Sequence, residues 1–269
     1  MALDTINDII NLLDSTNKNL ESKIKIASND AEITVRAMNA HHSKNIIKSA
    51  IDGPFATTQF NLVMYSILQD VVDAPLKSLN IYDKVLIMLQ LREKNVGDVL
   101  EIDLYNEDES TIKYKLNIAK HVAKMLKEKV TFEPRILDID SFAVSLKYPN
   151  IEEEFKFEDN FYKTKLSVID EKNDKSKRAL IAPMFINNIA QYVDTVTIAG
   201  QLIDLGIRSI NERLAIVEKL PALLMGKIIK SIDADYGKPI SKLVAISTLK
   251  DGKEYSGTVD INAGLFLVN

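Results

Sequence analysis

Cysteine is absent from the 269 residues, and its absence excludes several kinds of site at once. Without thiols the chain can form neither a disulfide nor a cysteine-ligated metal centre. A cysteine-free chain also suits a reducing cytoplasm. Only three histidines are present, and we assign no metal ligands among them.

Long apolar runs and a strong charge of either sign are missing as well. No run approaches the roughly 18–20 residues that a membrane-crossing helix needs. The first residues carry Asp4, Asp8 and Asp14 and no basic stretch, unlike a secretion signal. The net charge is −4, whereas a nucleic-acid-binding surface is usually basic. We therefore expect a soluble protein that stays where it is made and binds neither membranes nor nucleic acid.

The residues that are present predict a mixed fold. Hydrophobic residues make up 46% of the chain and charged residues 27%, an ordinary globular composition. The apolar pattern predicts an α+β fold that is mainly helical, with an N-terminal β-hairpin, a β-rich middle segment and a C-terminal hairpin. We expect three regions: helices and the first hairpin in residues 1–78, a helix and the β-rich segment in 79–169, and a helical region with a proline elbow and the last hairpin in 179–269. The polar run of residues 170–178 marks the second boundary as a mobile loop.

The first region opens with apolar residues at helical spacing over residues 3–13. This amphipathic helix either covers its own core or docks in the groove of a partner. Residues 23–38 read as a hairpin with a two-residue turn at Asn29–Asp30. That turn would place Ile26 opposite Ile33 and Ile24 opposite Val35. Helices are predicted next, at 39–51 and 55–72.

The middle region begins with a helix over residues 80–95, with Asp83 three residues after Asn80 as a cap and Gly97–Asp98 as its end. Residues 99–118 predict two strands joined by the acidic turn 107–109. A short helix and an extended stretch follow, at 117–128 and 129–148.

The last region contains the proline elbow, Ser209–Ile232. Ser209 and Glu212 match a capping box at the start of one helix, and Pro221 ends that helix and begins another. The stripe of the second helix is predicted to be Leu220, Leu224, Ile228 and Ile232, with Leu223 alongside. A helix at 180–193 and a strand at 195–203 with a turn at Gly200 precede the elbow. A hairpin around Asp251–Gly252, pairing Val244 with Val259, follows it, and residues 240–248 fit either helix or strand.

Candidate reactive groups do not assemble into a known motif. His41 and His42 are adjacent, so they point to different sides of a helix, and we expect a solvent-facing pair. Asp138 and Asp140 can share a strand face, which would suit acid–base chemistry, but no nucleophile or phosphate-binding loop accompanies them. The third histidine, His121, lies apart in the sequence.

Residues 233–237 hint at a calcium loop but fail as one, because the glycine is at the fifth position and Val244 is at the twelfth. We read them as a helix end running into a turn. No catalytic, cofactor-binding or metal-binding residue is therefore assigned, and no cofactor is expected.

Two charged pairs, Arg92–Glu93 and Glu212–Arg213, stand beside apolar helices. Exposed, each would contribute at most about 1 kcal/mol. Buried, an arginine that clamps a carboxylate or a helix end would fix how the elbow packs. We expect a structural role in either case.

Three segments resemble a phage protein family. The first is an ER-x-x-[IV]-[IV]-E-x-LP pattern, formed here by Glu212, Arg213, Ile216, Val217, Glu218, Leu220 and Pro221. The second is Tyr82–Glu101, an apolar helix that ends in LRE before a Gly-Asp turn, and the third is Phe142–Ile151. Together they resemble, over roughly residues 75–269, the baseplate hub subunits and hub assembly proteins of T-even-type contractile-tailed phages.

The resemblance implies a non-enzymatic structural or assembly protein of the baseplate hub, found in the virion tail and in the cytoplasm of the infected host. Its partners would be other tail and hub proteins, with self-association left open. Such relatives often hold a zinc ribbon on paired cysteines, which this chain lacks. The alternatives are a transient assembly chaperone that is absent from the mature particle, and an enzyme with an unrecognised site.

Overall fold

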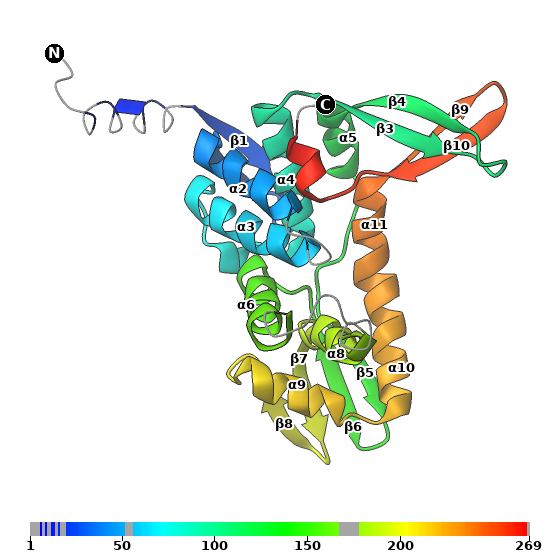
Figure 1. Cartoon of the computed structure of the whole chain (residues 1–269). Helices are drawn as coiled ribbons and strands as arrows, with labels where there is room; N and C mark the ends of the chain where they lie inside the picture. The colour runs from blue at the N-terminus through cyan, green and yellow to red at the C-terminus, as the bar shows by residue number, and fades with distance from the viewer. Residues whose placement is uncertain are drawn as a thin grey trace.

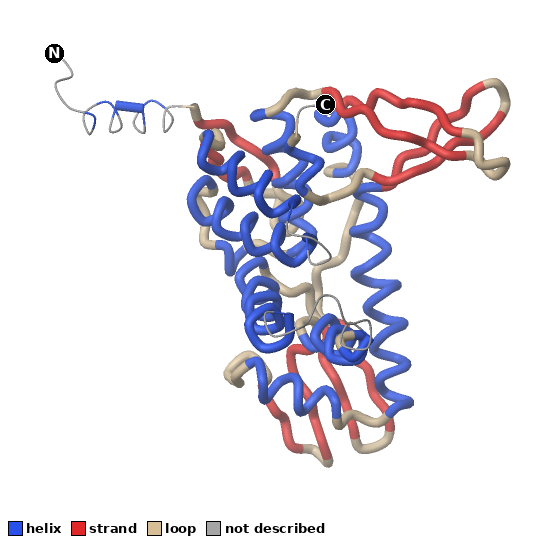
Figure 2. The backbone as a smooth tube through the Cα atoms, viewed as in Figure 1, coloured by secondary structure: helices blue, strands red, loops and turns tan. Residues whose placement is uncertain are grey.

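The computed structural model describes residues 20–51, 56–166 and 178–267, together with single positions before residue 20. The chain forms an elongated molecule with a helical body, an arm of strands that projects from it, and a second sheet at the opposite end (Figure 1). Figure 2 shows the two four-stranded sheets at these two ends with helices between them, and the strands of the N-terminal hairpin beside the helices. The opening helix predicted at 3–13 and the polar run at 170–178 fall largely outside the described residues. The three regions stay a prediction.

The N-terminal hairpin forms, but its predicted register is wrong. β1 (Glu21–Lys25) pairs with β2 (Glu32–Arg36) so that Ile24 faces Ile33. The loop is longer than two residues because the Asp83 carboxylate accepts hydrogen bonds from the backbone N–H groups of Ala27 (3.0 Å) and Ser28 (3.1 Å). A register shift of two residues keeps every side chain on its face, since strand side chains alternate with period 2. The hairpin's apolar side chains are therefore still buried.

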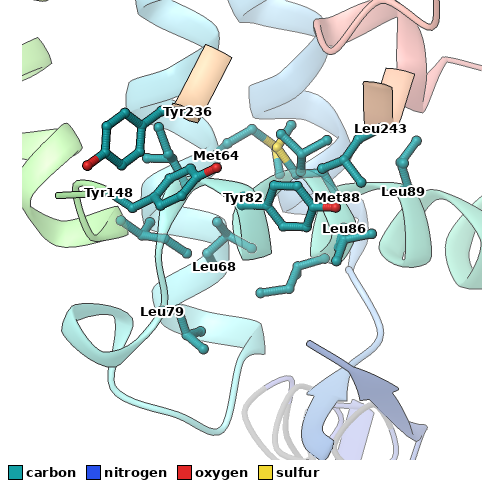
Figure 3. Packing of buried hydrophobic residues seen from close by; sticks show 14 of the residues in the cluster. Met64, Leu68, Leu79, Tyr82, Leu86, Met88, Leu89, Tyr148, Tyr236 and Leu243 are labelled. Atoms are coloured by element: carbon teal, nitrogen blue, oxygen red, sulfur yellow. The ribbon is translucent and has the colours of Figure 1, made fainter. Parts of the chain in front are cut away.

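The helical body is built around α4 (Ile81–Asn95), which follows α2 (Ala40–Ile51), α3 (Ala56–Val71) and the 3-10 turn η2 (Leu76–Ser78). The predicted cap of α4 is confirmed as a capping box between Asn80 and Asp83. Val85 to Leu89 are all buried, so α4 is apolar on every side at its centre, as a core helix must be. Figure 3 shows Leu86, Met88 and Leu89 packed among side chains from distant parts of the chain.

The arm joins segments that are far apart in the sequence. β3 (Val99–Tyr105) and β4 (Thr111–Asn117) form the predicted hairpin, and α5 (Ile118–Met125) follows it. The C-terminal hairpin of β9 (Ala245–Lys250) and β10 (Lys253–Thr258) lies beside it, in the order β4-β3-β10-β9. The predicted pairing at its base is confirmed, because the Val259 N–H donates to the Val244 carbonyl at 2.8 Å. The 3-10 turn η5 (Ala263–Phe266) then returns to the helical body.

The second sheet lies at the other end of the molecule, in the order β5-β6-β7-β8. Its strands are β5 (Arg135–Ile139), β6 (Phe142–Leu146), β7 (Val193–Ile198) and β8 (Gln201–Asp204). Val144, Leu146 and Val196 on its inner face are fully buried. The helices beside it are α6 (Ile151–Phe161) with its π-helical end η3 (Tyr162–Leu166), α8 (Ile181–Ala190) and α9 (Ile210–Glu218). The predicted α+β fold with hairpins near both ends is confirmed.

The proline elbow is confirmed. α9 has the Ser209–Glu212 capping box, and α10 (Ala222–Ser231) begins directly after Pro221. Leu224 and Ile228 of the predicted stripe are buried, but Leu223 is 70% exposed and does not belong to it. Leu223 directly precedes Leu224 on the helix, so it points to a different side.

The predicted turn after α10 is wrong, because the helix continues through the π-helical segment η4 (Ile232–Gly237) into α11 (Lys238–Val244). Pro239 has no N–H to bond the Asp235 carbonyl four residues earlier, and a proline ring would crowd that carbonyl. The Tyr148 hydroxyl donates to the Asp235 carbonyl instead, at 3.2 Å. The Tyr236 hydroxyl donates to the Leu146 carbonyl at 2.8 Å, so buried tyrosines hold the long helix to the rest of the chain where its own bonding is interrupted.

Candidate interaction surfaces

The adjacent histidines have different environments, which corrects the prediction of a solvent-facing pair. His41 is exposed, whereas His42 is buried and its Nε2 lies 2.9 Å from Asp70 Oδ2. The backbone N–H of Asn39 donates to His42 Nδ1 at 3.2 Å. Burial lowers the pKa of His42, and the Asp70 carboxylate offsets only part of this effect. His42 is thus a neutral side chain that ties the start of α2 to α3.

The remaining candidate groups are dispersed. His121 is buried on α5, with Nε2 2.6 Å from the Leu243 carbonyl of α11. Asp138 and Asp140 are exposed at the other end of the molecule, and Asp140 sits in a turn with φ of 50°. Within the part of the chain that is described, no group of three or more histidine, aspartate or glutamate side chains is placed to hold a metal ion.

Arg213 of the elbow connects α9 to α6 and to the junction between α8 and β7. Arg213 is 3% exposed, its guanidinium forms an ion pair with Glu153 of α6, and it lies over the Phe157 ring at 4.8 Å. It also donates to the carbonyls of Ala190 and Val193, each at 3.2 Å, where α8 passes into β7. Of the two alternatives for this arginine, exposed or buried, the structure shows the buried one, with the side chain paired to a carboxylate.

Arg92 acts on its own helix. It is buried and donates to the Gly97 carbonyl, just past the end of α4, where Gly97 has a φ of 134°. Desolvation lowers the pKa of Arg92, and nearby Asp98 opposes this. This arginine therefore also has a structural role, because its side chain bonds the backbone just past the end of α4.

A polar cleft of about 410 Å³ lies where η4 faces the segment between α5 and β5. Two of its lining side chains are Tyr82 and Tyr236, and burial raises the pKa of each to about 12. Both phenols therefore stay protonated at neutral pH. The Asp235 carboxylate, which also lines the cleft, accepts a hydrogen bond from the Ser231 hydroxyl at 2.6 Å. This bond links the end of α10 to η4.

Large apolar side chains are exposed at several places among the described residues, and three of these places are the arm, the outer face of the second sheet and α8. On the arm they include Tyr105 and Leu249, the second of which is 77% exposed. On the outer face of the second sheet, Ile136 and Leu202 flank a row of small residues, Ala143, Ser145, Thr195 and Thr197.

The third place is α8, where Ile181, Met184 and Phe185 are exposed at i, i+3 and i+4. Sequence reasoning found this helix but assigned it no outer face. The available signal was that apolar residues occupy two sides of α8, since Ile189 and Ala190 are buried on another side.

No helix among the described residues is both long enough and apolar enough to cross a membrane. Comparison with known proteins gave no match among curated proteins and no match among solved structures. Residues 17–260, however, match the family described as T4 bacteriophage base plate protein. The match covers both sheets, the helical body and the elbow. The chain therefore belongs to the T4 bacteriophage base plate protein family.

Proposed function

We propose that this base plate protein is a non-enzymatic structural or assembly component of the central hub, and that it acts through contacts with other tail proteins. Its family membership supports a role in the base plate. The resemblance of the elbow and of Tyr82–Glu101 to hub proteins supports the hub in particular. The proposed location is the tail base plate of the virion and, before assembly, the cytoplasm of the infected host.

The observation that carries the proposal is the projecting arm. Its two hairpins extend from the helical body, and Val99, Tyr105 and Leu249 expose 47%, 53% and 77% of their surface. Its outer strands, β4 and β9, each have an edge that pairs with no other strand in the described part of the chain. Unpaired edges and exposed apolar side chains together suit a partner that adds a strand or packs on the face.

The dispersal of the polar groups supports the non-enzymatic part of the proposal. Asp138 lies on β5 and Asp140 in the turn that follows it, whereas His121 is bonded to α11 beside the arm. A general acid or base must reach its substrate together with the other reacting groups. Side chains at opposite ends of the molecule do not meet this requirement.

Mass spectrometry of purified virions tests the structural role. A hub subunit should be present in a fixed ratio to the other base plate proteins. If the chain were detected in infected cells but not in virions, it would act as a transient assembly chaperone and not as a subunit. Such a chaperone would use the same surfaces and leave before the particle matures.

A further inference from the structure

A groove of about 450 Å³ opens at the base of the projecting arm, where α5 lies (Figure 1). The end of β4, α5 and the start of β9 line it. β4 and β9 are the two outer strands of the arm, and the described lining includes no residue of the inner strands β3 and β10. The groove therefore lies beside the free edges of the outer strands, where a further strand could add.

Charge of one sign gathers in this groove. Its charged side chains are Lys115 of β4 and Lys120 and Lys124 of α5, and no carboxylate is among the described residues that line it. Lys120 and Lys124 stand four residues apart on one side of α5. Both are exposed and form no ion pair with another described residue. A cleft lined by cations alone raises the local concentration of anionic partners.

The hairpin of β3 and β4 shows what kind of strand β4 accepts. On β4, Lys113 and Lys115 alternate with apolar residues. Asp103 and Glu101 of β3 stand opposite them, and Lys113 Nζ lies 2.9 Å from Glu101 Oε1. One edge of β4 is thus paired with a strand in which acidic and apolar residues alternate. The free edge belongs to the same strand, so it presents the same side chains to a partner.

The lining of the groove suits both halves of such a pattern. Tyr114 and Leu116 of β4 and Ile246 of β9 supply its apolar part. An extended segment along the free edge of β4 would place apolar side chains beside Tyr114 and Leu116, and acidic ones opposite the lysines of the strand. Because β4 leads directly into α5, the same segment would pass Lys120 and Lys124.

We propose that an extended segment of another tail protein, in which acidic and apolar residues alternate, adds to the free edge of β4 as a fifth strand of the arm. This inference rests on the proposed function, because the partner is a tail protein. A second β4 would bring lysines against lysines, which disfavours self-pairing at this edge. A nucleic acid would supply negative charge but no row of backbone N–H and C=O groups, and the net charge of the chain is −4.

Fluorescence anisotropy with a labelled peptide tests the proposal on the purified full chain. The peptide is the sequence of β3, Val99–Tyr105, preceded by two glutamates for the end that passes α5. It should bind, and Lys120→Glu with Lys124→Glu should weaken its binding about tenfold. Lys44→Glu with Lys48→Glu, at exposed positions four residues apart on α2, is the matched control and should leave binding unchanged. A peptide with lysine in place of its acidic residues should not bind.

Two further measurements separate strand addition from a purely electrostatic contact. Two peptides, N-methylated at odd and at even positions, keep their charge. One of them should lose binding, because it cannot donate hydrogen bonds to the strand edge. Hydrogen exchange in β4 should slow when the unmodified peptide is added, and exchange in the second sheet should stay unchanged. Circular dichroism checks that each variant is folded.

Several results would overturn the proposal. These are a peptide that does not bind, binding that survives the α5 variant or both N-methylations, and protection of β9 without β4. Tighter binding of an oligothymidylate, lost in the same variant, would overturn it by assigning the groove to nucleic acid. A chain that occurs in virions in a fixed ratio but does not bind the peptide would refute this inference alone. A chain that binds the peptide but retains no tail protein from infected cells would refute the proposed function and the tail protein as partner, but not the strand-accepting edge.

Discussion

The two four-stranded sheets contain the same number of strands but are constructed differently. In the second sheet, β6 and β7 pair along their length, and Val144, Leu146, Val193 and Val196 are fully buried. In the arm, the two hairpins meet at Ser256 and Tyr105. There Gly257 approaches β3 so closely that an added Cβ would lie 2.8 Å from Leu104 Cδ2.

The difference separates a sheet that is part of the core from one that projects into the solvent. The buried face of the second sheet contributes to the stability of the whole chain, as fully buried apolar side chains do. The arm keeps much of its surface in water, and Leu249 near its tip is 77% exposed. We therefore expect substitutions near the second sheet to unfold the protein, and substitutions on the arm to change local order or binding.

The largest expected effect is at the clamp beside the second sheet. Arg213→Met leaves the carboxylate of Glu153 buried with only Lys147 near it, at 3.8 Å. Removal of one partner of a buried ion pair typically costs about 3–5 kcal/mol. Urea unfolding should report this loss. The double variant with Glu153→Met should regain much of it, and a double variant as unstable as the single one would show that the pair itself is not the cause.

The next effect compares the two sheets directly. Leu146→Ala, at a fully buried position of β6, should lower the free energy of unfolding by about 2–5 kcal/mol. Leu249→Ala, on β9 of the arm, should change it by no more than about 0.5 kcal/mol. Thermal or urea unfolding of the two variants measures both values. Equal losses would contradict the distinction between the sheets.

A smaller effect tests the contact between the two hairpins. Gly257→Ala places a methyl group against Leu104 and 3.0 Å from the Asp103 carbonyl, so the strands must move apart, at a cost of about 1–3 kcal/mol. Hydrogen exchange should quicken in β9 and β10 and stay unchanged in β6 and β7. Faster exchange in both sheets would show that the arm is an integral part of the core.

The smallest effect depends on pH and concerns the helical body that lies between the sheets. The pKa of His42 is lowered from 6.5 in the folded chain, chiefly by burial. The unfolded chain therefore takes up the proton first as the pH falls below 6.5, and the free energy of unfolding declines until the pH passes the folded pKa. His42→Asn should reduce this decline. If the variant showed the same pH dependence, other titrating groups would be responsible for the decline in the free energy of unfolding.

Local signals in the sequence were sufficient for much of the fold. The capping boxes at Asn80 and Ser209, the elbow at Pro221 and the hairpin at Asp251–Gly252 all depend on neighbouring residues, and the structure contains each of them. The burial of Arg213 was also anticipated as one of two outcomes. Features of this kind can be predicted because the residues that form them are close together in the sequence.

Three of the errors, the register of the first hairpin, the missed π-helix and the buried histidine, involve partners far along the chain. Asp83 sets the loop of the first hairpin from 55 residues away, and Tyr148 supports the helix at Asp235 from 87 residues away. The buried His42 contacts Asp70 of α3, 28 residues further along the chain. A single sequence contains no local sign of such contacts, so neither the register, the π-helix nor the buried histidine could be read from it.

Co-purification from phage-infected cells tests the central claim, that the chain acts by binding other base plate proteins through exposed apolar surfaces. The tagged full chain should retain tail proteins, and an arm variant with Tyr105→Lys and Leu249→Lys should retain much less of them while remaining folded. A full chain that retains no tail protein would contradict the account. If the folded arm variant retained as much tail protein as the unmodified chain, the arm would not be the surface that binds these proteins.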